Sequence, residues 1–414
     1  MEGVGNTFSG YTSKLEEELK KSGEYMEPGW FDFFVEPKLI LEKKGEKEER
    51  QELTLDDILK RKENVVITGE PGIGKSSFLR WTGIHLCRAY ELLPVHVHLI
   101  NYSGNLKNDL LNGIGRCDAA LVDPSYQDHD KLSTKFKDGK VVFLFDALDE
   151  AGNIQQVSQQ IKELKADPQY RNNQFIVSVR TNIYAPNQLG DFVELKMQPF
   201  TEEQIQKYLE QKPELKGGNS KVVYDRLHSD AQLMDLCKLP LMLRFITEIS
   251  GELEGITNKA KLYERFIDQR FFTREEREKG STDTYRKAKI DILAELAYFM
   301  QTDKAVISEY GGRRIDTGMG YELLLDRAGK HKHLSSKDVG EVVDEIKANG
   351  LLIKEGREVS TYRFLHLTIQ EYLTARAIKM RVTAEEVPFV SGVDKMSIKD
   401  FMDRHVRYED KTFS

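Results

Sequence analysis

Four short segments in the first half of the chain are apolar, or alternate between apolar and polar residues. Such segments are typical of strands that are buried in a parallel sheet. Stretches with helical spacing lie between them, and the spacing of residues 154–165 predicts a crossover helix of this kind. We therefore predict strands and helices in alternation, joined by right-handed connections. The predicted strands are residues 65–67, 95–100, 141–145 and 175–179.

Helical spacing replaces this alternation from Pro199 onward. Thr201 and Gln204 form a capping box ahead of one predicted helix. Pro240 opens another helix, at a position where its missing N–H is harmless. Further amphipathic helices are predicted at residues 259–272 and 284–300, with a loop at 279–281.

The last folded segment has the element order of a winged helix. A helix that begins after the capping residues 335–338 is followed by two short strands and then by a helix from His366 onward. The candidate recognition helix carries more acidic than basic residues, and an acidic face repels phosphates, so we expect it to face a protein. The predicted strands are residues 351–354 and 361–364. The acidic residues of the candidate recognition helix are Asp338, Glu341, Asp344 and Glu345, and its basic residues are Lys337 and Lys347.

The first sixty residues are polar and mixed. Residues 14–21 form a charged helical segment that we expect to be a solvated face. Residues 30–35 are the one apolar cluster, which we expect to pack on the next domain. Residues 53–62 predict a short helix that leads into the first core strand.

Composition and charge restrict the class of protein. The chain has 414 residues, of which 39% are hydrophobic and 31% are charged, and its formal net charge is -7. This charge argues against a general nucleic-acid-coating or membrane-surface role, and no apolar run approaches the roughly 20 residues that span a bilayer. The start of the chain lacks the pattern of a signal peptide. Because the three cysteines, Cys87, Cys117 and Cys237, form no framework, we expect a reduced, cytoplasmic protein without a membrane partner.

The strongest chemical motif follows the strand at 65–67 and fits G-x-x-x-x-G-K-[ST] at every fixed position. We expect Gly69, Gly72 and Gly74 to adopt φ values closed to other residues, so that backbone N–H groups turn inward around phosphates. Lys75 would contact the β- and γ-phosphates and Ser76 would hold Mg²⁺. The alternative is a glycine-rich turn with an incidental lysine. The predicted nucleotide-binding residues of this loop are Gly69, Glu70, Pro71, Gly72, Ile73, Gly74, Lys75, Ser76 and Ser77.

A second candidate site follows the strand at 141–145. Asp146 comes at its carboxyl end, where open α/β sheets bind ligands, and this suits Mg²⁺ binding. The small Ala147 would let the backbone pass close to the phosphates. Asp149 and Glu150 would orient or deprotonate the attacking water. The alternative is an acidic loop that caps a helix.

Two further observations concern polar residues on predicted strands. Arg180 follows the strand at 175–179 and could sense the γ-phosphate, with a structural ion pair as the alternative. His96 and His98 alternate with apolar residues and so lie on one side of their strand. With no third ligand nearby, we do not expect them to bind a metal.

We therefore predict an α/β P-loop NTPase domain, with a parallel sheet flanked by helices, followed by a helical domain and a winged-helix domain. The expected segments are an N-terminal extension at 1–50, the nucleotide-binding domain at 51–200, the helical domain at 201–275, the winged-helix domain at 276–380 and a C-terminal tail at 381–414.

Over residues 35–380 the order of these elements resembles the NACHT family of signal-transducing (STAND) P-loop NTPases. The most telling segment is the last, because a His-x-x-x-Gln-Glu-Tyr helix after a winged-helix hairpin is uncommon. The segments that carry the resemblance are GEPGIGKSS at 69–77, VVFLFDALDE at 141–150, SVRT at 178–181, KLPLML at 238–243 and FLHLTIQEYLTA at 364–375.

The resemblance implies roles for three residues. Pro240 would contact the base, Arg180 would sense the γ-phosphate, and His366 would bind the β-phosphate of ADP in a closed state. A core or capping histidine is the alternative for His366. Such proteins exchange ADP for ATP, hydrolyse ATP slowly, and form homo-oligomers when ATP is bound. They often act in innate immunity or antiphage defence, through a trigger and an effector partner that the sequence does not identify.

Two features depart from the family pattern. No N-terminal effector is recognisable, and after Met380 no repeat period of a sensor follows. Either this sequence is part of a longer chain, or a very short or separate partner performs the sensor and effector functions. Two rival functions stay open. One is a working ATPase of the AAA+ or kinase type, and the other is a nucleotide-controlled transcription regulator, which the acidic helix face disfavours.

Overall fold

The computed structural model describes residues 8–21, 29–43, 49–89, 92–151, 153–215, 219–249, 253–270, 283–331, 334, 339–348, 350–355 and 360–383. The chain divides into two compact units, Met1–Thr247 and Glu248–Ser414, which are called unit 1 and unit 2 below. The predicted cap at 335–338, the loop at 279–281 and most of the predicted tail lie outside the described residues.

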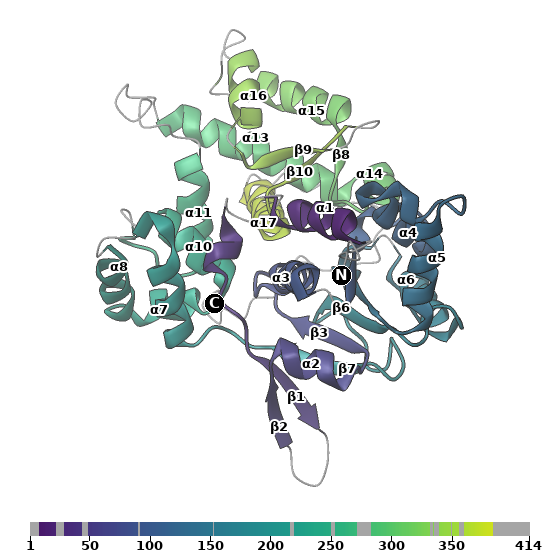
Figure 1. Ribbon diagram of the computed structural model, residues 1–414. Coiled ribbons are helices and arrows are strands. Elements are labelled where there is room, and N and C mark those ends of the chain that lie inside the picture. Colours follow the sequence, from purple (N-terminus) through teal and green to yellow (C-terminus); the bar gives the residue numbers. More distant parts are fainter. Residues whose placement is uncertain are drawn as a thin grey trace. The chain divides into compact units, whose positions relative to one another are not determined.

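Unit 1 is built on a mostly parallel seven-stranded sheet (Figure 1). Five strands are parallel in the order β7-β3-β6-β5-β4, and the hairpin β1–β2 adds two antiparallel strands beside β7. The strands are β1 Leu39–Lys43, β2 Glu49–Leu53, β3 Val65–Gly69, β4 Leu93–His98, β5 Val141–Asp146, β6 Gln174–Arg180 and β7 Val193–Met197.

All four strands predicted from apolar segments are present as β3, β4, β5 and β6, although β4 ends at His98 and the last two residues of the strand predicted at 95–100 belong to a short 3-10 helix. Every residue of β5 is buried, as expected for a strand covered on both faces. The strand β6 lies between β3 and β5, so the ends of these three strands are neighbours at one edge of the sheet. The predicted crossover helix between β5 and β6 is α6, Ile154–Ala166.

Helices flank the sheet, and α3 follows β3 and packs on β3, β4, β5 and β6. The helices of unit 1 are α1 Ser9–Lys20, α2 Leu55–Arg61, α3 Lys75–Ala89, α4 Leu106–Cys117, α5 Gln127–Lys137, α6 Ile154–Ala166, α7 Glu202–Gln211, α8 Asn219–His228, α9 Ala231–Cys237 and α10 Pro240–Glu248, the last residue of which belongs to unit 2.

The N-terminal segment is more closely integrated than its charges predict. The helix α1 presents its charged side chains to solvent, as expected, and it also buries an apolar side against α3 and α4, which was not predicted. Tyr11 of α1 donates a hydrogen bond to the carbonyl of Pro94 at 2.8 Å. The apolar cluster at 30–35 packs on unit 1 as expected, because Phe34 stacks on Trp81 of α3.

The predicted helix starts at residues 201 and 240 are both present. Thr201 and Gln204 make the reciprocal bonds of a capping box at the start of α7. Pro240 is the first residue of α10. The predicted helix at 53–62 is shorter, because Leu53 ends β2 and α2 begins at Leu55.

Unit 2 contains helices and a three-stranded antiparallel sheet in the order β8-β10-β9. The two predicted strands correspond to β9 and β10, which pair antiparallel with Leu352 opposite Phe364. The helices α13 and α17 pack on each other, and both carry fully buried residues such as Leu293 and Leu373. The elements are α11 Lys259–Arg270, α13 Asp283–Thr302, α14 Lys304–Tyr310, β8 Ile315–Asp316, α15 Thr317–Lys330, α16 Val339–Ala348, β9 Leu352–Glu355, β10 Thr361–Phe364 and α17 Leu367–Thr383.

Candidate functional site

The predicted phosphate loop connects the end of β3 to the start of α3. Gly72 and Gly74 have φ values of 79° and 105°, which side chains rarely allow, as predicted. Gly69 differs, because it ends the strand β3 and is not among the residues with positive φ. A Cβ there would lie 2.9 Å from Ile73 Cγ2, so glycine is needed at this position for close packing rather than for its φ value.

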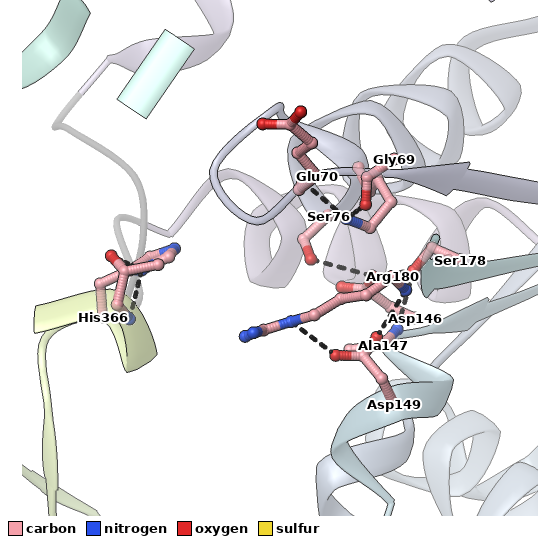
Figure 2. A network of polar contacts seen from close by, with 11 residues as sticks. Gly69, Glu70, Ser76, Asp146, Ala147, Asp149, Ser178, Arg180 and His366 are labelled. Atoms are coloured by element: carbon pink, nitrogen blue, oxygen red, sulfur yellow. Dashed lines mark hydrogen bonds and ion pairs between the residues drawn. The ribbon is translucent and has the colours of Figure 1, made fainter. Parts of the chain in front are cut away.

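Lys75, the first residue of α3, folds back on the loop that precedes it. Its Nζ donates to the carbonyl oxygens of Gly69 at 2.8 Å and Glu70 at 3.0 Å (Figure 2). Burial lowers the pKa of Lys75 from 10.5 to about 8, against the opposing effect of the nearby Asp149 carboxylate. The amino group is thus held at the loop as a hydrogen-bond donor.

Ser76 and Asp146 come together although seventy positions separate them in the sequence. The Ser76 hydroxyl donates to Asp146 Oδ1 at 2.9 Å, and the Ser178 hydroxyl donates to the same oxygen at 2.7 Å (Figure 2). The backbone N–H of Ala147 donates in turn to Ser178 Oγ at 2.8 Å. Ala147 has a left-handed φ of 61°, which costs roughly 1–2 kcal/mol in a residue with a Cβ. This network fixes the Asp146 carboxylate beside the start of α3.

Two histidines of β4 lie on the same face of the sheet as Asp146. His98 is opposite Asp146 in the strand register, and His96 is two residues before it. Burial alone would raise the pKa of Asp146, but His98, His96 and the two hydroxyl donors outweigh it and lower the pKa. Burial also lowers the pKa of His96 to about 3 despite the attraction of Asp146. Its Nε2 is buried and has no hydrogen-bond partner among the described residues.

Asp149 and Arg180 form a buried ion pair at the same edge of the sheet. Arg180 Nε lies 2.9 Å from Asp149 Oδ2, and the backbone N–H of Arg180 donates to Asp149 Oδ1 at 3.2 Å (Figure 2). Their side chains are 12% and 3% exposed, so water weakens this pair little. Arg180 is opposite Gly69 in the register of β6 and β3, and it therefore lies next to the phosphate loop. Glu150 follows Asp149 and is half-buried.

Helix α10 begins against the phosphate loop. The backbone N–H of Leu241 donates to the carbonyl of Gly72 at 3.1 Å. A Cβ on Gly72 would approach Leu241 Cβ to 3.0 Å, and one on Gly74 would lie 3.9 Å from Pro240 Cγ. Pro240 therefore lies beside the loop.

The other predicted residues occupy different surroundings. Glu70 is exposed, whereas Pro71 and Ser77 are half-buried. His366 belongs to unit 2, where it precedes α17. Its Nδ1 accepts a hydrogen bond from the backbone N–H of Thr368 at 3.1 Å and lies 2.8 Å from the Thr368 hydroxyl. His366 is therefore an N-cap of α17, which is the alternative role considered for it.

Two contributors were missed at the sequence level. Ser178 is the single polar residue within an apolar run and lies two positions before Arg180, a signal that could have identified it. The contact from Leu241 is made by its backbone N–H, which no residue type reveals.

Within the described parts of the chain, no three or more His, Cys, Asp or Glu side chains are grouped so that they could hold a metal ion. The oxygens at Ser76 and Asp146 are nevertheless the ligand type that Mg²⁺ prefers, with water and phosphates as its remaining ligands. Among the described helices, none combines the length and apolar character needed to cross a membrane.

A glycine loop that cradles Lys75 and delivers Ser76 to a buried strand-end aspartate defines the P-loop NTPase class. Residues 63–214 match the family model of the NACHT domain, which confirms the resemblance noted in the sequence over these residues. A P-loop domain of this family implies nucleotide binding, typically with Mg²⁺.

Similarity to solved structures includes proteins of Aeropyrum pernix and Pyrococcus horikoshii. The ORC2 protein of Aeropyrum pernix is 13% identical, with 78% of this chain and 89% of that chain covered and a TM-score of 0.35. A STAND protein with a tetratricopeptide repeat sensor from Pyrococcus horikoshii is 14% identical, with 80% and 45% covered and a TM-score of 0.37. No curated protein sequence matches the chain.

Proposed function

We propose that this protein is a nucleotide-dependent switch that binds ATP and ADP with Mg²⁺ and hydrolyses ATP slowly. One observation carries the proposal: the phosphate loop, Asp146 and the Asp149–Arg180 pair lie at the same edge of the sheet. Ligands of open α/β sheets bind at this edge.

The residues of the loop fit an Mg²⁺-nucleotide. Ser76 Oγ and Asp146 Oδ1 already share one hydrogen bond at 2.9 Å, and together they would hold Mg²⁺, which would supply positive charge to the phosphates. Lys75 would exchange its bonds to the Gly69 and Glu70 carbonyls for bonds to phosphate oxygens. Ser178 would keep the Asp146 carboxylate in place by its hydrogen bond.

The ion pair divides the two candidate carboxylates between different roles. Asp149 accepts two hydrogen bonds from Arg180, which favours a role in positioning that side chain as a sensor of the γ-phosphate. We therefore assign the attacking water to Glu150, which would orient it and accept its proton. Asp149 would contribute to hydrolysis mainly through Arg180.

We propose a helical domain at 201–275 and a winged-helix domain at 276–380. The sheet β8-β10-β9 and the helices around it support the second assignment. On α16, Lys347 pairs with Asp344 at 3.0 Å and Lys289 of α13 pairs with Glu345. Lys347 and Lys289 already pair with carboxylates. We therefore expect α16 to contact a protein partner rather than nucleic acid.

The switch would work by exchange of ADP for ATP. Pro240 would contact the base, and His366 would bind the β-phosphate of ADP in a closed state. Because Nδ1 of His366 accepts from Thr368, the ring proton lies on Nε2, from which it can donate to a phosphate. ATP would release this closed state and allow homo-oligomers to form, in an immune or antiphage response with a partner still to be identified.

The test is to measure ATP turnover and native mass of one preparation in ADP and in ATP, with Lys75→Ala as the control for nucleotide binding. A switch predicts slow turnover and a larger assembly in ATP than in ADP. Steady turnover with the same mass in both nucleotides would instead indicate a working ATPase.

A further inference from the structure

The hairpin β1–β2 leaves one strand at the rim of the unit 1 sheet (Figure 1). Among the strands that the structure describes, β2 pairs with β1 alone. The opposite rim strand, β4, differs because Tyr11 of α1 bonds to its Pro94 carbonyl. A strand with one neighbour presents N–H and C=O groups with which another strand can pair.

The side chains of β2 leave room for a further partner. Arg50 is 68% exposed and lies 3.8 Å from Glu42, whereas Glu52 is 53% exposed and lies 3.5 Å from Lys38. Exposed ion pairs of this length contribute little free energy and are easily exchanged. Arg50 and Glu52 of β2 can therefore both pair with charges of a neighbouring chain.

The order of residues in β2 is complementary to itself. The strand reads Glu49, Arg50, Gln51, Glu52, Leu53. If two copies pair antiparallel with Gln51 opposite Gln51, each Arg50 faces Glu52 of the second copy. A shift of two residues in either direction would place Arg50 opposite Arg50 or Glu52 opposite Glu52, and like charges directly opposite are destabilising.

The same pairing would extend a row of charges that already crosses the sheet. Lys196 of β7 pairs with Glu42 of β1, and Glu42 lies beside Arg50 of β2. The signs alternate along this row, so the next position outward suits a carboxylate. Glu52 of the second copy would supply it.

We propose that β2 pairs antiparallel with β2 of a second copy of this chain, so that two sheets join across a two-fold axis at Gln51. Such an interface uses the same strand of both chains, as two-fold symmetry requires. It involves neither the nucleotide site nor unit 2, and it is independent of the proposed function. With five residues per strand the contact is small, so the dimer is weak and depends on concentration.

A charge exchange tests the register. Arg50→Glu and Glu52→Arg would each convert both attractive pairs to repulsive ones and weaken the dimer on the order of tenfold or more. A mixture of the two variants restores opposite charges at both pairs, so dimers recover although neither variant dimerises well alone. Sedimentation equilibrium of the nucleotide-free protein at low salt measures all four samples.

Charges on an edge strand also serve to prevent association, and this alternative predicts a monomer. A monomeric wild-type protein at every concentration would therefore overturn the proposal. A mixture that recovers no dimer would overturn the proposed register.

Crosslinking gives a second readout that does not depend on charge. Directly opposite Cα atoms in an antiparallel pair are about 4.5–5.5 Å apart, which a disulfide can bridge. Gln51→Cys should therefore crosslink two chains with glutathione disulfide as oxidant. The control Glu49→Cys would place its thiols four residues apart along the strand, about 14 Å, which is too far. Equal crosslinking of both variants would contradict pairing at Gln51.

Discussion

The buried ring of His96 makes a quantitative prediction about stability and pH. Its pKa falls from 6.5 to about 3 because burial disfavours the charged imidazolium. The groups that affect it most are Asp146, Arg80 and His98, of which only Asp146 favours protonation. Between these two values the unfolded chain binds a proton that the folded chain does not, so stability decreases as pH falls.

The size of the effect follows from linkage. One pKa unit corresponds to about 1.4 kcal/mol, so the loss between about pH 7.5 and about pH 5 is about 2 kcal/mol. The loss in this pH range depends mainly on the pKa of His96 in the unfolded chain, because its pKa in the folded chain lies well below 5. The loss would continue as the pH falls toward 3.

The chain provides a suitable probe, because both of its tryptophans, Trp30 and Trp81, belong to unit 1. Urea unfolding followed by tryptophan fluorescence should show the loss for the wild type and much less for His96→Leu. His228→Leu is the matched control, since its side chain is 63% exposed, and should keep the wild-type pH dependence. If His96→Leu and the wild type lose the same free energy between these pH values, the buried neutral imidazole is not the cause.

Four further predictions concern the site. Lys75→Ala should abolish ATP and ADP binding in a folded protein, and undiminished affinity by calorimetry would show that the site lies elsewhere. Glu150→Gln should bind ATP yet hydrolyse it at least about tenfold more slowly, because general bases typically contribute 10²–10⁴; Glu150 has no such role if the rate is unchanged. Ser178→Ala removes the acceptor of the Ala147 N–H and should cost about 1–3 kcal/mol in urea unfolding, whereas a loss of a few tenths would contradict the buried network. His366→Ala should release ADP on the order of tenfold faster in stopped flow. His366→Asn keeps a side chain that can accept the N-cap hydrogen bond. A normal ADP off-rate in this variant would show that His366 caps α17 and does not bind the phosphate.

The nucleotide-binding core was readable from the sequence because its strands are buried by their own apolar residues. The strands β3, β5 and β6 are apolar almost throughout, and the phosphate loop has a fixed spacing that follows from its geometry. The hairpin β1–β2 and the strand β7 were not predicted. Their residues are mixed, and their pairing depends on partners distant in sequence, such as Leu39 opposite Met197.

The candidate site was only partly predictable for a related reason. Residue types indicated that Ser76, Asp146 and Arg180 would meet, because each stands at the end of a core strand or the start of its helix. The sequence did not indicate that Asp149 pairs with Arg180, because an acidic loop can form an ion pair with any basic side chain nearby. The left-handed backbone of Ala147 was also hidden, because nothing in the sequence distinguishes it from an ordinary alanine.

The hydrogen bond between Leu241 and Gly72 is made entirely by the backbone. Since Pro240 has no N–H, Leu241 supplies the first backbone donor of α10, and any residue except proline at position 241 would supply the same one. The side chain at position 241 can therefore change during evolution without breaking the link between the loop and the helix. Proteins of very different sequence could retain this contact, and an alanine scan would fail to detect it, whereas proline at position 241 would remove it.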